Sequence, residues 1–475
     1  MAETKLRAGA LRLSGVLMQG ITHTAPATAI LFTIQFITSK AGVAAPLAYL
    51  LAFLIVLTLG ISLAQLAKHL PSAGGYYTYV SRTVHPRAGF LTSWLYFLYD
   101  PTSAGFSLAF VGAILEATLK VEYQLIFPWW LFLLISGSFV AFVTYRGIEL
   151  SGRMLMVFGI AEIVIVLLLS FWGLFHPGLG RINFSSFDPG NAPSPGGLYL
   201  AVVFSIFALT GWEGVVPLAE ESENPRRNLP RAIMGSIIAM GSFLVICSWF
   251  LLLGWGTNSI SGFAESQQNP TFALARRFWG AGWVLLPIAL LNSMIAVAIA
   301  CNNAATRVWF AMARSGSLPR PLAKVHPKFQ TPVNAVALQT IAMFAVGLGL
   351  GFLVGPENEF HLMGTVITFA LIFIYSAGNL GVFLYYSRER KAEFNWILHA
   401  ACPLLGTAAL FFVGYNSLFP WPAPPVGYAP WIVGVWLGLG ILILVVMKLT
   451  GNEQWISSAG QIAREHEDVP SNKPN

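Results

Sequence analysis

Residues 13–38 read LSGVLMQGITHTAPATAILFTIQFIT, an apolar run that is interrupted in its middle by Thr22-His23-Thr24-Ala25-Pro26. About twenty apolar residues are enough to cross the hydrocarbon core of a bilayer. Proline removes a backbone donor, and unwound backbone at membrane depth is tolerated only where it is buried in protein or lines a cavity. The stretch therefore predicts a membrane helix that is broken near its centre. An ordinary proline kink is the alternative interpretation.

A second apolar run, residues 197–219, is interrupted in the same way. It contains Thr210-Gly211-Trp212-Glu213-Gly214 and, shortly after, Pro217. Each of the two interrupted runs opens a block of five apolar runs. Paired interruptions at matching positions of two halves are the best sequence indication of a transporter binding site. The two breaks therefore predict both the fold and the position of the site.

The composition agrees with a membrane protein. Of the 475 residues, 56% are hydrophobic and only 10% are charged, whereas soluble domains carry about 25% charged residues. We expect an all-α integral membrane protein with about twelve transmembrane helices. The apolar runs place these helices at 13–38, 44–67, 89–118, 127–145, 154–175, 197–219, 232–256, 283–313, 333–354, 362–386, 397–418 and 431–447.

The distribution of basic residues predicts the orientation. If residues 1–12 lie in the cytoplasm, all but five of the 27 Lys and Arg residues fall on the cytoplasmic side; the exceptions are Lys40, Lys120, Arg181, Arg276 and Arg277. This asymmetry follows the positive-inside rule. We therefore expect a multi-pass protein of the cell inner membrane with cytoplasmic tails at 1–12 and 450–475. The net charge of +7 then indicates topology and not nucleic-acid binding.

Three loops carry a family resemblance. They are PSAGGYYTY at 71–79, AEESENPRRNLPRAI at 219–233, and FAMARSGSLP at 310–319 with Val325-His326-Pro327 and Thr331-Pro332 behind it. In this order, and on this side of the membrane, they resemble the loops after helices 2, 6 and 8 of the amino acid–polyamine–organocation (APC) transporters. The resemblance covers about residues 11–386, and the last two membrane helices fit it by number only.

The resemblance implies a transporter core at 13–386 built as a five-plus-five inverted repeat, with repeats at about 13–175 and 197–386 and with helices 1 and 6 discontinuous. Two additional membrane helices occupy 387–449. It also implies alternating access, in which a bundle of helices 1, 2, 6 and 7 moves against a scaffold. Proton coupling, sodium coupling or exchange usually accompanies this architecture.

The chain departs from the family at the first break. Family members usually carry a glycine-rich Gly-Ser/Thr-Gly stretch there, and its backbone N–H groups hold the substrate carboxylate. The matching residues here are His23-Thr24-Ala25, followed by Pro26. Because of this difference, the usual binding of an α-carboxylate at the first break is not assured, and amines are candidate substrates as well as α-amino acids.

Substrate contacts are expected from both breaks and from the third helix. Phe207 matches an aromatic residue that closes over substrate in the family, and Trp212 is a second candidate lid, although aromatic residues are common in any membrane helix. A lone buried His is often a satisfied structural group, so His23 has a structural alternative as well. The predicted substrate-binding residues are Thr22, His23, Thr24, Ala25, Pro26, Asp100, Phe207, Ala208, Thr210, Gly211 and Trp212.

Acidic residues at membrane depth are costly and are functional hypotheses by default. Glu213 lies in the second break, where the family often has an acid implicated in coupling; capping of free backbone N–H groups is the alternative. Glu162 lies near the position of a Lys in some proton-coupled members, where it could bind a cation or exchange a proton, or pair with a helix dipole or Arg. Asp100 could pair with a substrate ammonium or with backbone freed by Pro101.

The leading functional interpretation is a secondary transporter for an amino acid or small amine, coupled to protons or exchanging. A transporter of the same fold for a polyamine, amino alcohol or inorganic cation is the runner-up, and a transport-dead sensor is a third possibility that the short tails oppose. An enzyme is not expected, because P-loop, metal-ligand and nucleophile-elbow patterns are missing from the sequence.

The remaining expectations concern partners. Cys247, Cys301 and Cys402 all fall in apolar runs and are interpreted as small buried hydrophobes, with no disulfide and no metal site. No cofactor and no nucleic acid is expected. The expected partners are the small-molecule substrate, a coupling proton and the lipid bilayer. Asn292, Asn302, Asn303 and Asn379 are expected to form interhelical hydrogen bonds. The sequence makes no prediction of oligomeric state.

Overall fold

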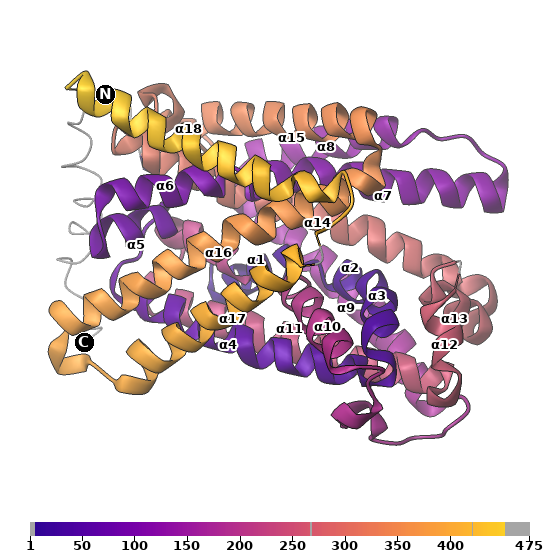
Figure 1. Ribbon diagram of the computed structural model, residues 1–475. Coiled ribbons are helices and arrows are strands. Elements are labelled where there is room, and N and C mark those ends of the chain that lie inside the picture. Colours follow the sequence, from indigo (N-terminus) through magenta and orange to yellow (C-terminus); the bar gives the residue numbers. More distant parts are fainter. Residues whose placement is uncertain (1–4, 267, 420, 452–475) are drawn as a thin grey trace, which may run out of the picture.

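The computed structural model describes residues 5–266, 268–419 and 421–451, and this part of the chain is helical with no β-strand beyond two isolated bridges. Long helices run roughly parallel from one end of the molecule to the other (Figure 1). The expected all-α class is confirmed. The C-terminal tail expected at 450–475 lies almost wholly outside the described residues.

Both expected helix breaks are present. Two residues, Thr24 and Ala25, separate helix α1 (Leu13–His23) from helix α2 (Pro26–Leu31), and Ala25 has a left-handed φ of 56°. In the second break α10 (Pro195–Phe207) ends and the 3₁₀ helix η4 (Trp212–Glu221) follows. Gly211 in this gap has a φ of 117°, a conformation that glycine adopts at low cost. Pro and Gly thus interrupt both helices where the sequence places them.

The other helices follow the hydropathy runs closely. The first half of the chain continues with α3 (Thr33–Ala41), α4 (Ala45–His69), α8 (Trp129–Tyr145) and α9 (Ile148–Phe175). The second half contains α11 (Pro225–Trp255), α14 (Leu285–Arg314), α15 (Val333–Val354), α16 (Pro356–Arg388), α17 (Cys402–Leu418) and α18 (Ala429–Leu449). A π-helical turn, Ile397–Ala401, precedes α17.

One predicted helix was wrong in its continuity. The run 89–118 was expected to be a single helix, but it consists of α6 (Pro86–Tyr96) and α7 (Asp100–Tyr123) with a turn between them. Pro101 stands in the first turn of α7. The N–H groups of a first turn have no partner within the helix, so a proline there removes no helical hydrogen bond. Short helices at α5 (Tyr76–Thr83), α12 (Ile260–Ala264) and α13 (Pro270–Trp279) were also missed, because they are too short for a hydropathy span.

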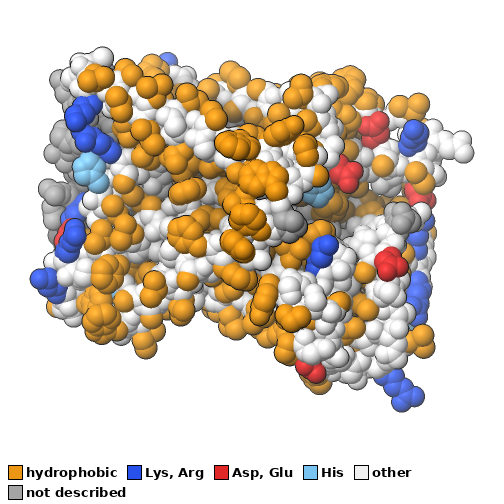
Figure 2. Space-filling model, viewed as in Figure 1, with side chains coloured by type: hydrophobic (Ala, Val, Ile, Leu, Met, Phe, Trp, Pro, Cys, Tyr) orange, Lys and Arg blue, Asp and Glu red, His pale blue; other side chains and the backbone are white. Residues whose placement is uncertain are grey.

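Ten helical segments among the described residues are long and apolar enough to cross a membrane. The two remaining expected spans are the seventeen-residue α8 and the interrupted first helix, whose pieces are each short. Apolar side chains cover the middle of the visible face, and charged side chains gather toward its two ends (Figure 2). An apolar middle between charged ends is the surface expected of a protein that crosses a bilayer.

Side-chain amides form hydrogen bonds between helices, as expected. Asn292 donates to the carbonyl of Phe158 at 2.7 Å and joins α14 to α9, and Asn379 donates to the carbonyl of Pro403 at 3.1 Å. Asn302 accepts from the side chain of Gln339 at 2.9 Å. Polar bonds between helices hold a bundle together where the lipid gives no hydrophobic drive.

The described part of the N-terminal tail packs on the protein. Leu11 pairs with the chain after η4, since its N–H donates to Glu221 at 2.9 Å and its carbonyl accepts from Glu223 at 2.8 Å. Leu6 is buried in a small cluster with Phe310 and Val325, and Arg7 pairs with Glu149 at 2.9 Å. We call the face that carries this segment the terminal face and the opposite one, with α12 and α13, the distal face.

Candidate functional site

The two helix breaks touch each other. A Cβ atom added to Gly211 would lie 2.6 Å from the backbone carbon of His23, and one added to Gly214 would lie 1.9 Å from the Nδ1 atom of the same residue. Only glycine allows so close an approach at both positions. The sequence predicted the two breaks separately, and the fold places them against each other.

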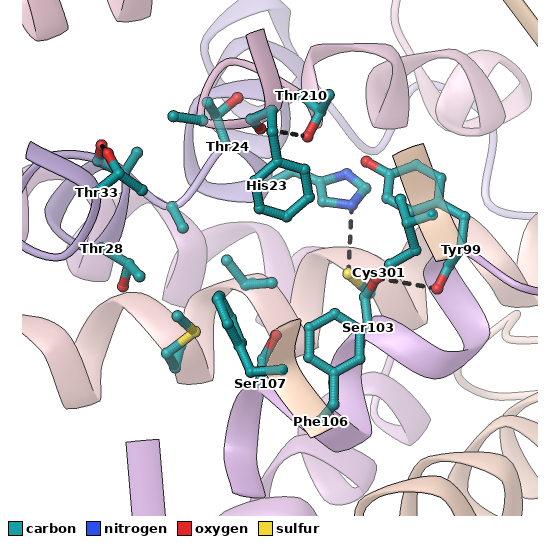
Figure 3. A pocket seen from close by; sticks show the side chains of 18 residues that line it. His23, Thr24, Thr28, Thr33, Tyr99, Ser103, Phe106, Ser107, Thr210 and Cys301 are labelled. Carbon is teal, nitrogen blue, oxygen red and sulfur yellow. Dashed lines mark hydrogen bonds between the residues drawn. The ribbon is translucent and has the colours of Figure 1, made fainter. Parts of the chain in front are cut away.

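A cavity of about 90 Å³ lies beside this contact (Figure 3). Its wall combines hydroxyl-bearing and apolar side chains from five parts of the chain. The lining residues are His23, Thr24, Ala25, Thr28, Ala29 and Thr33 from the first break, Tyr99, Ser103, Phe106 and Ser107 from α7 and its approach, Phe207, Ala208 and Thr210 from the second break, Met294, Val297 and Cys301 from α14, and Phe360 and Ile367 from α16. We call it the central cavity.

His23 is held by three neighbours at the base of the central cavity. Its Nε2 atom lies 2.8 Å from Oδ1 of Asp100 and 3.3 Å from Sγ of Cys301, and its ring stacks on Tyr99 (Figure 3). The side chains of His23 and Asp100 are 2% and 0% exposed. A polar cluster this deep in a bilayer persists only when its members satisfy one another.

The types of the three donor atoms raise the question of a metal site. The ligating atoms of His23, Asp100 and Cys301 all lie within 4.8 Å of one another. Ligands that surround one zinc ion at 2.0–2.3 Å stand apart from one another around the metal. In this structure the Nε2 atom of His23 is in direct contact with both the carboxylate and the thiol, and the three donor atoms are near enough to one another to surround one metal ion.

Asp100 connects the central cavity to a second, smaller one. Its other carboxylate oxygen accepts a hydrogen bond from the hydroxyl of Tyr96. Tyr96 lines the second cavity, of about 10 Å³, together with Glu213, Tyr76 and Ser93. Polar side chains therefore continue from the central cavity toward the terminal face.

Glu213 and Glu162 both lie behind the cavity wall. Glu213 is 4% exposed and accepts a hydrogen bond from the N–H of Gly211 at 3.1 Å. This contact is the capping of a backbone N–H group that was given above as the alternative to a coupling role. Glu162, on α9, is fully buried and accepts from the N–H of Ala27 at 3.0 Å. Each acid thus bonds to the backbone of one of the two breaks.

The predicted substrate-binding residues divide into two groups. His23, Thr24, Ala25, Phe207, Ala208 and Thr210 line the central cavity. Thr22, Pro26, Asp100, Gly211 and Trp212 do not line it, although Asp100 contacts His23 directly. Trp212 is 1% exposed and its ring faces Tyr375 at 5.7 Å between centroids.

Several lining residues were missed by the sequence reasoning. Tyr99 stacks on the His23 ring and lies in the interruption between α6 and α7, which hydropathy did not show. Cys301 contacts the same ring and was interpreted as a small buried hydrophobe. The hydroxyls of Thr28, Ser103 and Ser107 sit one or two turns from predicted residues. Ser103 and Ser107 follow Asp100 at helical spacing, so they could have been predicted to lie on the same face of the helix.

Two different seals lie above and below the central cavity. Toward the terminal face, Arg307 on α14 pairs with Glu221 of η4 through two bonds of 2.9 and 3.1 Å, with both side chains at most 1% exposed. Arg314 and Glu220 form a second pair. Toward the distal face, Phe360 of the cavity wall stacks on Phe110 at 4.2 Å. A buried ion pair thus lies toward the terminal face and an aromatic contact toward the distal face.

Comparison with known proteins gives the chain a family. The family model described as amino acid permease matches residues 15–463. The chain is 24% identical to the low-affinity putrescine importer PlaP of Escherichia coli K12 over 84% of its own length and 87% of the relative. It is 25% identical to the serine/threonine exchanger SteT of Bacillus subtilis over 78% and 82%, and 28% identical to the branched-chain amino acid permease BcaP of that organism over 70% and 72%.

Proposed function

We propose, from the premise that the chain belongs to the amino acid permease family, that it is a secondary transporter which carries an amino acid or a small amine across a membrane. The observation that carries the proposal is the central cavity, which is bounded by two helix breaks in mutual contact. Broken helices supply backbone donors, acceptors and dipoles at membrane depth, which a continuous helix cannot. The relatives named above carry putrescine, hydroxy amino acids and branched-chain amino acids.

The site follows from the same geometry. We place the solute in the central cavity, against Thr24 and Ala25 on one side and Phe207, Ala208 and Thr210 on the other. Cysteines introduced at Thr24 and Ala208 should be protected from thiol reagents by a transported solute. Equal labelling with and without that solute would contradict the placement.

The orientation and location are part of the proposal. The bias of Lys and Arg toward the terminal face supports an inner-membrane protein with that face in the cytoplasm. The bundle of helices 1, 2, 6 and 7 would then move against the scaffold, opening the Glu221–Arg307 seal to one side and the Phe110–Phe360 seal to the other.

We assign coupling to a proton that is bound by Glu162, with Glu213 transmitting the change at the second break. Glu162 forms no ion pair among the described residues, and its hydrogen bond to Ala27 ties it to the first break. Burial favours the neutral form of a carboxyl group and hydration favours the charged form. A carboxyl whose exposure alternates during the cycle can therefore take up and release a proton.

Glu162→Gln tests this assignment, because it fixes the neutral form with nearly the same shape. In proteoliposomes with an imposed pH gradient, net accumulation should fall by about ten-fold or more, while binding and exchange persist, since a buried group that cannot ionise cannot carry the proton. Glu357→Gln, an exposed acid in the first turn of α16, is the matched control and should accumulate solute normally.

Two results would contradict the assignment. Uptake that requires sodium and fails in choline buffer would replace the proton by sodium. A lower melting temperature with uniform loss of binding, exchange and accumulation in Glu162→Gln would make Glu162 a structural partner of Ala27.

A further inference from the structure

The first break offers no free backbone donor to an anionic substrate group between residues 24 and 27. The N–H of Thr24 donates to the carbonyls of Gly20 and Ile21 at 3.3 and 3.2 Å, and that of Ala25 donates to Thr22 at 3.0 Å. Pro26 has no N–H, and the N–H of Ala27 is taken by Glu162. A substrate carboxylate would need such groups, because an exposed helix N-terminus is where anions bind.

The charges around the central cavity also disfavour an anion. Neither Lys nor Arg is among the residues that line it. The buried Arg307 nearby is already engaged by both oxygens of Glu221. Asp100 and Glu213 stand behind the wall at 0% and 4% exposure. A buried charge is tolerated when a partner of opposite sign accompanies it. Asp100 already has His23 as its partner, whereas Glu213 bonds to the N–H of Gly211 and forms no ion pair among the described residues, so Glu213 is the acid that a cation would complement.

Acceptors for an ammonium group are present instead. Helices α1 and α10 both end at the cavity wall, at His23 and Phe207, and helix C-termini carry partial negative charge. The hydroxyl of Thr28 lines the cavity and is buried with no hydrogen-bond partner among the described residues. Phe106, Met294 and Val297 line the same cavity and suit a short apolar arm.

We propose that the central cavity selects a small organic amine without a carboxylate group. This narrowing rests on the proposed transport function and removes α-amino acids from its substrate range. The backbone of residues 24–27 at the first break leaves no donor for a carboxylate, because Glu162 occupies the N–H of Ala27 and Pro26 has none. A free amine needs no such backbone donor and is complemented by Glu213, the helix C-termini and the Thr28 hydroxyl.

Matched ligands test the proposal on the purified full-length protein. Each pair differs by one carboxylate: 3-methylbutylamine against leucine, and ethanolamine against serine, with 3-methylbutyrate as the anion alone. Thermal-shift titration should give an affinity for at least one amine about ten-fold or more above that for its amino acid, the equivalent of one decade in Kd. 3-Methylbutyrate should not stabilise the protein.

The outcomes separate this inference from the proposed function. Leucine or serine binding as tightly as its amine, or more tightly, overturns the amine selectivity and leaves the transporter proposal standing. If no amine and no amino acid stabilises the protein or is taken up by proteoliposomes, both proposals fail.

A variant places the amine in the cavity. Thr28→Val removes the unpartnered hydroxyl and keeps the shape, so the affinity for the preferred amine should fall about ten-fold with an unchanged melting temperature of the free protein. Thr118→Val is the matched control, since the Thr118 hydroxyl only bonds to the carbonyl of Ile114 on the same helix. Unchanged affinity in Thr28→Val would overturn the proposed position of the ammonium group.

Discussion

At the scale of single residues, His23 is the point where the site is assembled. It ends α1, faces Gly211 and Gly214 of the second break, and contacts Asp100 and Cys301. Its ring therefore joins the first break to the second and to helices α7 and α14. A change that moves this ring displaces all of them together.

Gly214→Ala tests the contact between the breaks. The added Cβ would lie 1.9 Å from Nδ1 of His23, and the ring cannot retreat without losing Asp100 or Cys301. Overpacking of this kind costs about 1–3 kcal/mol, so the melting temperature and solute affinity should both fall. Gly438→Ala on α18, where a Cβ meets nothing within 4 Å, should have no such effect. Wild-type affinity in Gly214→Ala would show that the breaks need not touch.

Sequence reasoning identified the residues that are unusual at membrane depth. His23, Asp100, Glu162 and Glu213 stand out because an ionisable group in a bilayer is costly, and all four are buried around the breaks. The neutral lining residues, such as Met294 and Val297, carry no such signal. They resemble every other apolar residue of a membrane helix, and only the packing of α14 against the breaks selects them.

At the scale of helices, the breaks at residues 24–25 and 208–211 were predictable because Pro and Gly act locally. The break between α6 and α7 was not recognised, although Asp100-Pro101 marks it. From a single sequence, a proline that begins a new helix cannot be distinguished from a proline inside a continuous one. Tertiary contacts decide between them, here the hydrogen bond from Tyr96 to Asp100 across the interruption.

Helix α18 shows how a peripheral span is fixed. Trp94 on α6 and Trp436 on α18 stack at 4.6 Å between centroids, and the indole N–H of each donates to the backbone carbonyl of the other at 2.6 Å. The α18 span is otherwise little buried within the protein. Besides its packing on α16 and α6, this reciprocal pair gives α18 a polar attachment to the core.

Trp436→Phe removes one of the two indole donors and keeps an aromatic ring. The carbonyl of Trp94 then loses the shorter of its two hydrogen bonds and keeps the one from the N–H of Phe97 at 3.3 Å. We expect a loss of about 1 kcal/mol, the usual net value of a hydrogen bond. Trp431→Phe on the same helix, a residue 68% exposed, should change the melting temperature much less. Equal effects of the two substitutions would mean that lipid contact, and not the pair, holds α18.

At the scale of the whole molecule, the two seals give the transporter its asymmetry. The terminal side is closed by Arg307–Glu221, by Arg314–Glu220 and by the N-terminal segment that pairs with the chain after η4. The distal side is closed by rings such as Phe110 and Phe360. An ion pair must separate two charges to break, whereas stacked aromatic rings can shift past each other and stay in contact. We therefore expect the terminal side to open by separation of ion pairs and the distal side to open by movement of aromatic rings.

The seal at the terminal face provides the last prediction. Replacing one member of a buried ion pair leaves an uncompensated charge and costs about 3–5 kcal/mol, whereas replacing both by apolar side chains is often neutral. The double variant Glu221→Met with Arg307→Met should therefore fold normally but lack the polar lock between η4 and α14. We expect a larger fraction of molecules open toward the terminal face.

The reporter for this opening is a cysteine at Ser93, which is 1% exposed and lines the second cavity. In detergent, the thiol of Ser93→Cys should react about ten-fold faster in the double variant, a shift of about 1.4 kcal/mol in the opening equilibrium. The exposed pair Arg276–Glu122 is the matched control, and its replacement by Met and Gln should leave the rate unchanged. Unchanged labelling in the Glu221–Arg307 variant would show that the N-terminal segment and the Arg314–Glu220 pair close the face without it. The ion pair would then be a structural tie between η4 and α14, and gating would have to be sought in the segment around Leu6 and Leu11, which covers the same face.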